Sequence, residues 1–225
     1  MTNNYLSTIL SLVSLAYSSL AIKRVFILTS SILDLLIEQL QCLPGVGQKT
    51  AQRMAYHLLQ RKRQAGSELA ITLAKAMEVI GQCQSCRNYT EHDLCSICQS
   101  SKRAEANAIC VVETASDLAA VEHSGQYQGR YFVLHGHLSP IDGVGPSELG
   151  LGQFETLLNE QDISEVILAL NPSVEGEATC QYIADICRSN NVAVSRIAHG
   201  IPVGGELEMV DTSTISHAIM GRKQF

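Results

Sequence analysis

Four cysteines in the spacing C-x2-C-x8-C-x2-C constrain the fold of this chain more than any other feature. They are Cys83, Cys86, Cys95 and Cys98. Two close pairs in a chain of 225 residues are typical of metal ligands rather than of a disulfide framework. Four thiolates can surround zinc completely. No histidine or carboxylate replaces a thiolate here, so nothing indicates the open coordination position that a catalytic zinc needs. The pattern predicts one structural zinc per chain; a redox-active CxxC is the alternative, which the presence of two pairs disfavours.

Charge is divided unevenly along the chain, although the formal net charge is only -6. Residues 42–103 carry nine basic and four acidic side chains, whereas residues 104–225 carry five basic and sixteen acidic ones. A polyanion would therefore be held by the first of these segments and a different partner by the second. Two solvated faces of unequal sign are the alternative. The aromatic content of 5%, without tryptophan, argues against an aromatic-rich surface for stacking single strands.

Residues 1–30 have a different character from the rest. The segment Tyr5–Ile22 is uncharged and rich in Leu, Ile and Ser, and it is long enough to be considered a signal or anchor segment. No basic region precedes it, and no convincing small-residue cleavage site is present. We therefore interpret residues 1–30 as an extension rather than a membrane segment, and we expect no membrane association.

A glycine hairpin between two helices is the candidate DNA site. Apolar residues at helical spacing predict a helix over residues 31–40, capped by Ser31, and a second helix over residues 48–60. Gly45 and Gly47 in the connection allow close backbone approach, and the N–H groups at the start of the second helix can hold a phosphate. An ordinary helical turn is the alternative interpretation.

Lys49 and Arg53 lie four residues apart on one face of the second helix, beside this phosphate site. Contacts of this kind hold the DNA backbone without reading bases. The segment is not a nucleotide P-loop, because Gln48 rather than glycine precedes the lysine.

A third helix is expected over residues 67–80, leading into the cysteine motif, and beyond residue 104 strands alternate with helices. The expected strands cover residues 108–112, 130–134, 165–170 and 192–197, and the expected helices cover residues 115–123, 152–159 and 177–188. This alternation predicts an α/β domain with a parallel sheet and helices on its faces. Ligands of such sheets bind at the carboxyl ends of the strands, which here are followed by Glu113 and by the segment Asn171–Glu177.

Several further motifs occur in order along the chain. The hairpin, the cysteine motif and Val112-Glu113 are followed by His135-Gly136-His137-Leu138-Ser139-Pro140, Asp142-Gly143-Val144-Gly145-Pro146, Asn171-Pro172-Ser173-Val174-Glu175-Gly176-Glu177 and Gly200-Ile201-Pro202-Val203-Gly204-Gly205-Glu206-Leu207. In this order they resemble the RecR family of bacterial recombination mediators, over roughly Ser31 to Lys223. The resemblance implies a helix-hairpin-helix, a small four-cysteine zinc motif and a Toprim-like α/β domain. The helix-hairpin-helix corresponds to residues 31–81, the zinc motif to residues 82–103 and the Toprim-like domain to residues 104–200. Residues 1–30 form the extension that precedes them, and residues 201–225 form a C-terminal segment.

The resemblance also implies a function. Members of the family are non-catalytic DNA-repair proteins that form ring-like homo-oligomers, which we expect here to be tetramers, and bind single- and double-stranded DNA without sequence preference. They work with RecO and RecF to load recombinase at single-strand gaps, in the cytoplasm at the nucleoid. Lys49 and Arg53 match the family's DNA-contacting lysine and arginine.

Catalytic Toprim proteins are the main alternative. They hold magnesium with a glutamate and an Asp-x-Asp pair. Here the glutamate is Glu113, but the pair is Asn171 and Ser173, both neutral, so we expect no catalysis although Glu175 and Glu177 could hold a weak ion. We expect an acidic surface that includes Glu113, Glu175 and Glu177 to bind a basic partner such as RecO.

A sequence-specific zinc transcription factor fits the sequence less well. No helix near the cysteines is rich in the arginine and asparagine side chains that read base edges.

Overall fold

The computed structural model describes residues 31–198 and 200–222, and these form two compact units that meet at Glu78 and Val79 in the sequence. The proposed extension, residues 1–30, lies outside the described residues. Among the helices of the described residues, none combines the length and the apolar character that crossing a bilayer requires.

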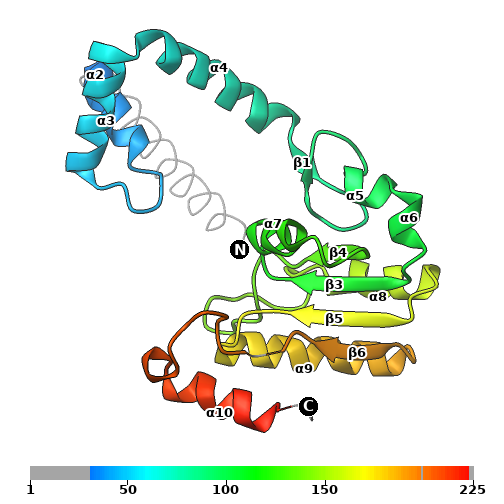
Figure 1. Ribbon diagram of the computed structural model, residues 1–225. Coiled ribbons are helices and arrows are strands. Elements are labelled where there is room, and N and C mark those ends of the chain that lie inside the picture. The colour runs from blue at the N-terminus through cyan, green and yellow to red at the C-terminus, as the bar shows by residue number, and fades with distance from the viewer. Residues whose placement is uncertain (1–30, 199, 223–225) are drawn as a thin grey trace, which may run out of the picture. The chain divides into compact units, whose positions relative to one another are not determined.

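Helices form the first unit: α2 (Ile32–Leu40), α3 (Gln48–Arg61) and α4 (Arg63–Val79), of which Val79 already belongs to the second unit. Ser31 caps α2 as predicted, and Asp34 completes a capping box by accepting a hydrogen bond from the Ser31 N–H. Helices α2 and α3 pack side by side (Figure 1). The buried face of α3 consists of alanines, Ala51 and Ala55, and such small side chains allow close helix packing.

Helix α4 begins four residues before the expected start at Ser67. Gly66 lies in its first turn, and the N–H of Gly66 donates to the carbonyl of Lys62. A glycine inside a helix costs about 1 kcal/mol relative to alanine. Because the backbone hydrogen bonds continue through Gly66, this cost does not delay the start of the helix.

The cysteine motif opens the second unit. Strands β1 (Gly81–Gln82) and β2 (Tyr89–Thr90) pair antiparallel, a short hairpin that the sequence pattern did not predict. Two one-turn helices follow, α5 (Ser96–Gln99) and α6 (Ser101–Ala104), and lead into the sheet.

The sheet is parallel, as the alternation of elements predicted, with the strand order β4-β3-β5-β6. Its strands are β3 (Ala108–Val112), β4 (Arg130–Val133), β5 (Glu165–Ala169) and β6 (Ala193–Arg196). Strand β3 therefore lies between β4 and β5, and the carboxyl ends of these three strands meet at one edge (Figure 1).

Helices cover both faces of the sheet: α7 (Ala115–Ser124), α8 (Leu151–Glu160) and α9 (Val174–Ser189). Alternate residues of β3 enter two separate cores. Ile109 and Val111 pack with apolar side chains of α8 and α9, whereas Cys110 and Val112 pack with Leu118 of α7. This arrangement makes three layers, with β3 buried on both faces.

The last elements of the described residues are the short 3₁₀ helix η1 (Leu207–Met209) and helix α10 (Thr212–Met220). Asp211 caps α10 by accepting the N–H of Thr214. Hydrogen bonds from the Ser213 and Thr214 side chains lower the pKa of Asp211. This segment exposes many large apolar side chains, among them Val203, Leu207, Met209, Ile219 and Met220.

Candidate metal centre and nucleic-acid interface

The four cysteines of the motif converge on one point. Their sulfur atoms all lie within 4.8 Å of one another. Among the described residues, they are the group of histidine, cysteine or carboxylate side chains that could hold a metal ion. Two elements bring them together, because the β1–β2 hairpin encloses Cys83 and Cys86 while Cys95 precedes α5 and Cys98 lies within it.

The thiols of this cluster are close enough to share protons. Hydrogen bonds from Cys86 and Cys98 lower the pKa of Cys95, while the pKa of Cys86 is raised, chiefly by its hydrogen bond with Cys95. The sulfur atoms of Cys86 and Cys95 lie 3.5 Å apart. Four convergent sulfur donors without an open position fit structural zinc, which binds thiolates and displaces their protons. The residues present therefore fit the metal that the sequence predicted.

The zinc motif contacts the outermost strand on one side of the sheet. This strand is β4, and the N–H of its residue Val133 donates to the carbonyl of Cys86 at 2.9 Å. His135, two residues after the end of β4, bonds through its Nε2 to the carbonyl of Arg87 at 2.7 Å, and its ring lies 5.2 Å from that of Tyr89. The motif thus accepts a hydrogen bond from one backbone N–H, that of Val133, which an exposed edge strand would leave unpaired.

Arg87 also anchors the motif to the sheet domain. Its guanidinium lies 5.8 Å from the centre of the Phe132 ring and donates to the carbonyls of Leu134 and Leu149. Burial lowers the pKa of this arginine. Gly150, with φ of +68°, leaves the space that the guanidinium occupies, since a Cβ there would overlap it. Sequence reasoning missed Arg87, because its acceptors lie more than forty residues away.

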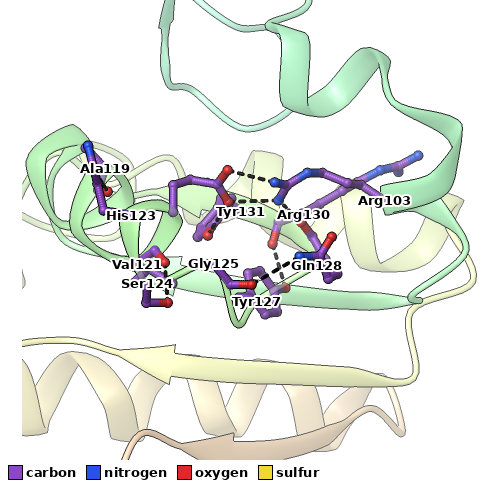
Figure 2. Close-up of polar contacts among 12 residues, drawn as sticks. Arg103, Ala119, Val121, His123, Ser124, Gly125, Tyr127, Gln128, Arg130 and Tyr131 are labelled. Carbon is purple, nitrogen blue, oxygen red and sulfur yellow. Dashed lines mark hydrogen bonds and ion pairs between the residues drawn. The ribbon is translucent and has the colours of Figure 1, made fainter.

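A second arginine ties the exit of the motif to the sheet domain. The guanidinium of Arg103 donates to both carboxylate oxygens of Glu122, at 2.8 and 2.7 Å, and to the carbonyl of Gly129 at 3.0 Å. Figure 2 shows Arg103 and Tyr131, the two labelled members of this network. Tyr131 donates its hydroxyl to the same carboxylate at 2.6 Å. Burial, and then this hydrogen bond, raise the pKa of Tyr131. Helix α6, helix α7 and strand β4 are therefore joined by one network.

The glycine hairpin leaves the start of α3 accessible. Gly45 adopts φ of +75°, a left-handed conformation that favours glycine, and Gly47 precedes α3 without any side-chain cap. A Cβ at either glycine would meet no atom within 4 Å. No side chain caps the first N–H groups of α3, so they can donate to a phosphate.

Lys49 and Arg53 line one surface depression on α3, together with side chains that sequence reasoning did not single out. These are Gln52, Tyr56, His57, Gln60 and Arg61. Neither Lys49, Arg53 nor Arg61 forms an ion pair with any residue in the described part of the chain. Helical periodicity from Lys49 could have found Tyr56 and Gln60, because they follow it by seven and eleven residues. The depression is therefore basic and lacks an acidic lining residue.

Glu113 lies at the carboxyl end of β3 and is buried, with 3% of its surface exposed. Its carboxylate accepts hydrogen bonds from the backbone N–H and the side-chain amide of Asn171. His137 lies on its other side, with Nδ1 at 3.1 Å. Magnesium prefers several oxygen ligands. This carboxylate is instead surrounded by nitrogen groups, so the residues present do not fit a magnesium site.

The rest of the Asn171–Glu177 segment is used to begin α9. Ser173 caps the helix by accepting the N–H of Gly176 at 3.0 Å, which explains why α9 starts at Val174 rather than at the predicted Glu177. Gly176 has no room for a side chain, because a Cβ there would overlap the Asn171 carbonyl. In the Asn-x-Ser pair, Ser173 therefore acts as a helix cap, and the amide nitrogen of Asn171 donates to Glu113.

The expected acidic surface is only partly present. Glu113 does not belong to it, because the sheet and the Asn171 loop bury its carboxylate. Glu177 is exposed but pairs with Arg196, at 2.5 and 2.7 Å. Glu175, in the first turn of α9, is exposed. Of the three glutamates, Glu175 is the one that remains a simple candidate for partner binding.

Comparison with protein families finds four matches in order along the chain. Residues 33–77 match the RecR helix-hairpin-helix, and residues 80–100 match the four-cysteine zinc finger domain of RecR. Residues 107–198 match the Toprim domain, and residues 200–223 match the RecR C-terminal region. The matches include α3 with its basic face, the four cysteines, and the sheet with the Glu113 cluster.

Proposed function

The chain belongs to the RecR family and has that family's role in DNA repair and recombination, and we propose that it acts there as a clamp-like recombination mediator. It binds single- and double-stranded DNA without sequence preference through the hairpin and α3. The observation that carries this proposal is the basic depression of Lys49 and Arg53 beside the uncapped start of α3. Such a surface suits phosphates and offers little that reads a base sequence.

Exposed apolar surface supports assembly of several copies. Helix α4 buries none of its side chains within the described residues, and it exposes Leu69, Ile71, Leu73 and Met77. Apolar patches of this kind on a helix are typical of protein interfaces. We therefore propose a ring of identical subunits that encloses DNA, with four copies, the number that the family resemblance implies.

A non-catalytic role is supported by the Glu113 cluster. A magnesium-dependent Toprim enzyme is the alternative, and it would need carboxylates where Asn171 and Ser173 stand. The hydrogen bonds to Glu113 favour a structural role for this carboxylate.

Charge and thiol chemistry support the proposed partners and location. Glu175 is offered to a basic partner, which we propose to be RecO, with RecF as a further partner in loading recombinase at single-strand gaps. A four-thiolate zinc site suits a reducing compartment, in agreement with a cytoplasmic protein at the nucleoid.

Light scattering tests the clamp. The mass of the protein is measured alone and with each of two DNA molecules of equal length and unrelated sequence, and titration gives the affinity for each DNA. We expect a mass of several subunits, a further rise with DNA, and affinities for the two sequences within about twofold. A monomer under both conditions would refute the clamp, and a strong preference for one sequence would refute backbone recognition.

A further inference from the structure

One aromatic side chain lies within the basic depression of α3. The side chain of Tyr56 is exposed, with 40% of the residue's surface accessible, and it lines the same depression as Lys49 and Arg53. Its hydroxyl accepts a hydrogen bond from the Gln52 side-chain amide at 3.5 Å. Its ring pairs with no other aromatic ring in the described part of the chain. The hydroxyl of Tyr56 thus has a hydrogen-bond partner on α3, while its ring is available for stacking.

The spacing along α3 places this ring close to basic side chains. Residues 49, 53, 56 and 60 follow one another at three- and four-residue intervals and therefore share one face. From Lys49 to Tyr56 the helix rises about 10 Å, and from Tyr56 to Arg61 about 8 Å more. Lys49 and Arg53 thus precede Tyr56 on this face, and Arg61, five residues beyond it, lines the same depression. The helix itself contains no acidic residue.

We infer that Tyr56 stacks on a base of single-stranded DNA while Lys49, Arg53 and Arg61 hold the neighbouring phosphates. Proteins that bind single strands combine a basic groove with aromatic side chains in this way, and every base has a ring face to offer. Bases in a duplex are already stacked on one another, so Tyr56 contributes only to the binding of single strands. This inference rests on the proposed DNA-binding function and adds to it a residue that distinguishes the two forms of DNA.

The test compares Tyr56→Ala with Tyr56→Phe in the full chain. Phenylalanine keeps the ring and loses the hydroxyl, so we expect single-strand affinity within about twofold of the unmodified protein. Alanine removes the ring, and we expect single-strand affinity to fall about five- to hundredfold, the range that loss of one stacked base implies. Tyr182→Ala is the matched control, because Tyr182 is 41% exposed but lies on α9.

Oligonucleotides with abasic sites separate stacking from phosphate contacts. They keep the charge of the strand but lack bases, so the unmodified protein should bind them more weakly, whereas Tyr56→Ala should bind both strands alike. Duplex affinity should change by less than about twofold in every Tyr56 variant, and thermal unfolding checks that each variant is folded.

The outcomes distinguish this inference from the function on which it rests. Equal single-strand affinity of Tyr56→Ala and the unmodified protein overturns the stacking role, even when Lys49→Ala still weakens binding. An equal loss for single strands and duplex also overturns it, because the ring would then contribute to both. Absence of any DNA binding by the unmodified protein refutes the proposed function itself.

Discussion

The side-chain amide of Asn171 donates a hydrogen bond to the buried carboxylate of Glu113, 58 residues earlier in the chain. A buried carboxylate is costly unless hydrogen-bonded donors or a cation compensate its charge. Asn171 and His137 provide that compensation here with nitrogen groups of the chain itself. The cluster therefore holds the ends of β3 and β5 together without needing a metal.

The first prediction concerns magnesium. The purified protein should show no magnesium-dependent DNA cleavage, relaxation or primer synthesis, because Asn171 and Ser173 stand where two carboxylates would be needed. Supercoiled and single-stranded substrates with and without magnesium provide the measurement. Robust activity that disappears in Glu113→Gln would show that the site is catalytic after all.

Zinc content provides the second prediction. Protein purified without a chelator should contain about one zinc per chain, and Cys86→Ser should lower both the zinc content and the melting temperature, because metal binding contributes to the folding of such motifs. Elemental analysis and thermal unfolding measure the two effects. Cys42→Ser is the control, since Cys42 is exposed and outside the cluster. Unmodified protein without zinc would contradict the assignment.

The third prediction concerns the network around Arg103. Its side chain and that of Glu122 are only 19% and 25% exposed, so Arg103→Ala should lower the free energy of unfolding by about 1–3 kcal/mol. Arg188→Ala provides the comparison, because the Arg188–Asp185 pair is 62% and 60% exposed and should contribute about 0–0.5 kcal/mol. Denaturant unfolding measures both, and equal losses would argue against a special role for Arg103.

DNA affinity as a function of salt is the fourth prediction. Lys49→Ala and Arg53→Ala should each weaken binding to unrelated sequences about equally, because each removes one of the proposed phosphate contacts. The slope of log affinity against log salt should fall in magnitude by about 0.9 on duplex and about 0.7 on single strands for each variant. Lys75→Ala on α4 is the control for loss of one positive charge. Losses that depend on sequence would indicate base contacts instead.

The fifth prediction concerns partner binding. Glu175→Lys should weaken capture of RecO in a pull-down and leave DNA affinity unchanged or slightly raised, because it reverses a charge on the exposed start of α9. Glu155→Lys makes the same charge change on α8 and should retain RecO. The ion pair of Glu177 with Arg196 makes Glu177→Lys a less direct test, since that change also breaks a structural contact. Loss of DNA binding in Glu175→Lys would contradict the division between the two surfaces.

The sequence alone determined the local features of this protein. The cysteine spacing predicted the zinc ligands, the capping serine predicted the start of α2, and the alternation of strands and helices predicted the parallel sheet. Each of these signals lies within a short stretch of chain, where backbone geometry alone relates the residues to one another. Even so, α4 and α9 begin earlier than predicted, because Gly66 did not interrupt one helix and Ser173 capped the other.

Only the tertiary structure decided which distant residues meet. The strand order places β3 beside both β4 and β5, so Glu113 becomes buried against Asn171 and His137 instead of joining an exposed acidic surface. In the same way, the docking of the zinc motif on β4 determines the partners of Arg87 and His135. A periodic pattern indicates which face of an element is apolar, but it does not specify the neighbouring element. Packing between elements therefore decides whether a charged side chain is paired and buried or remains exposed.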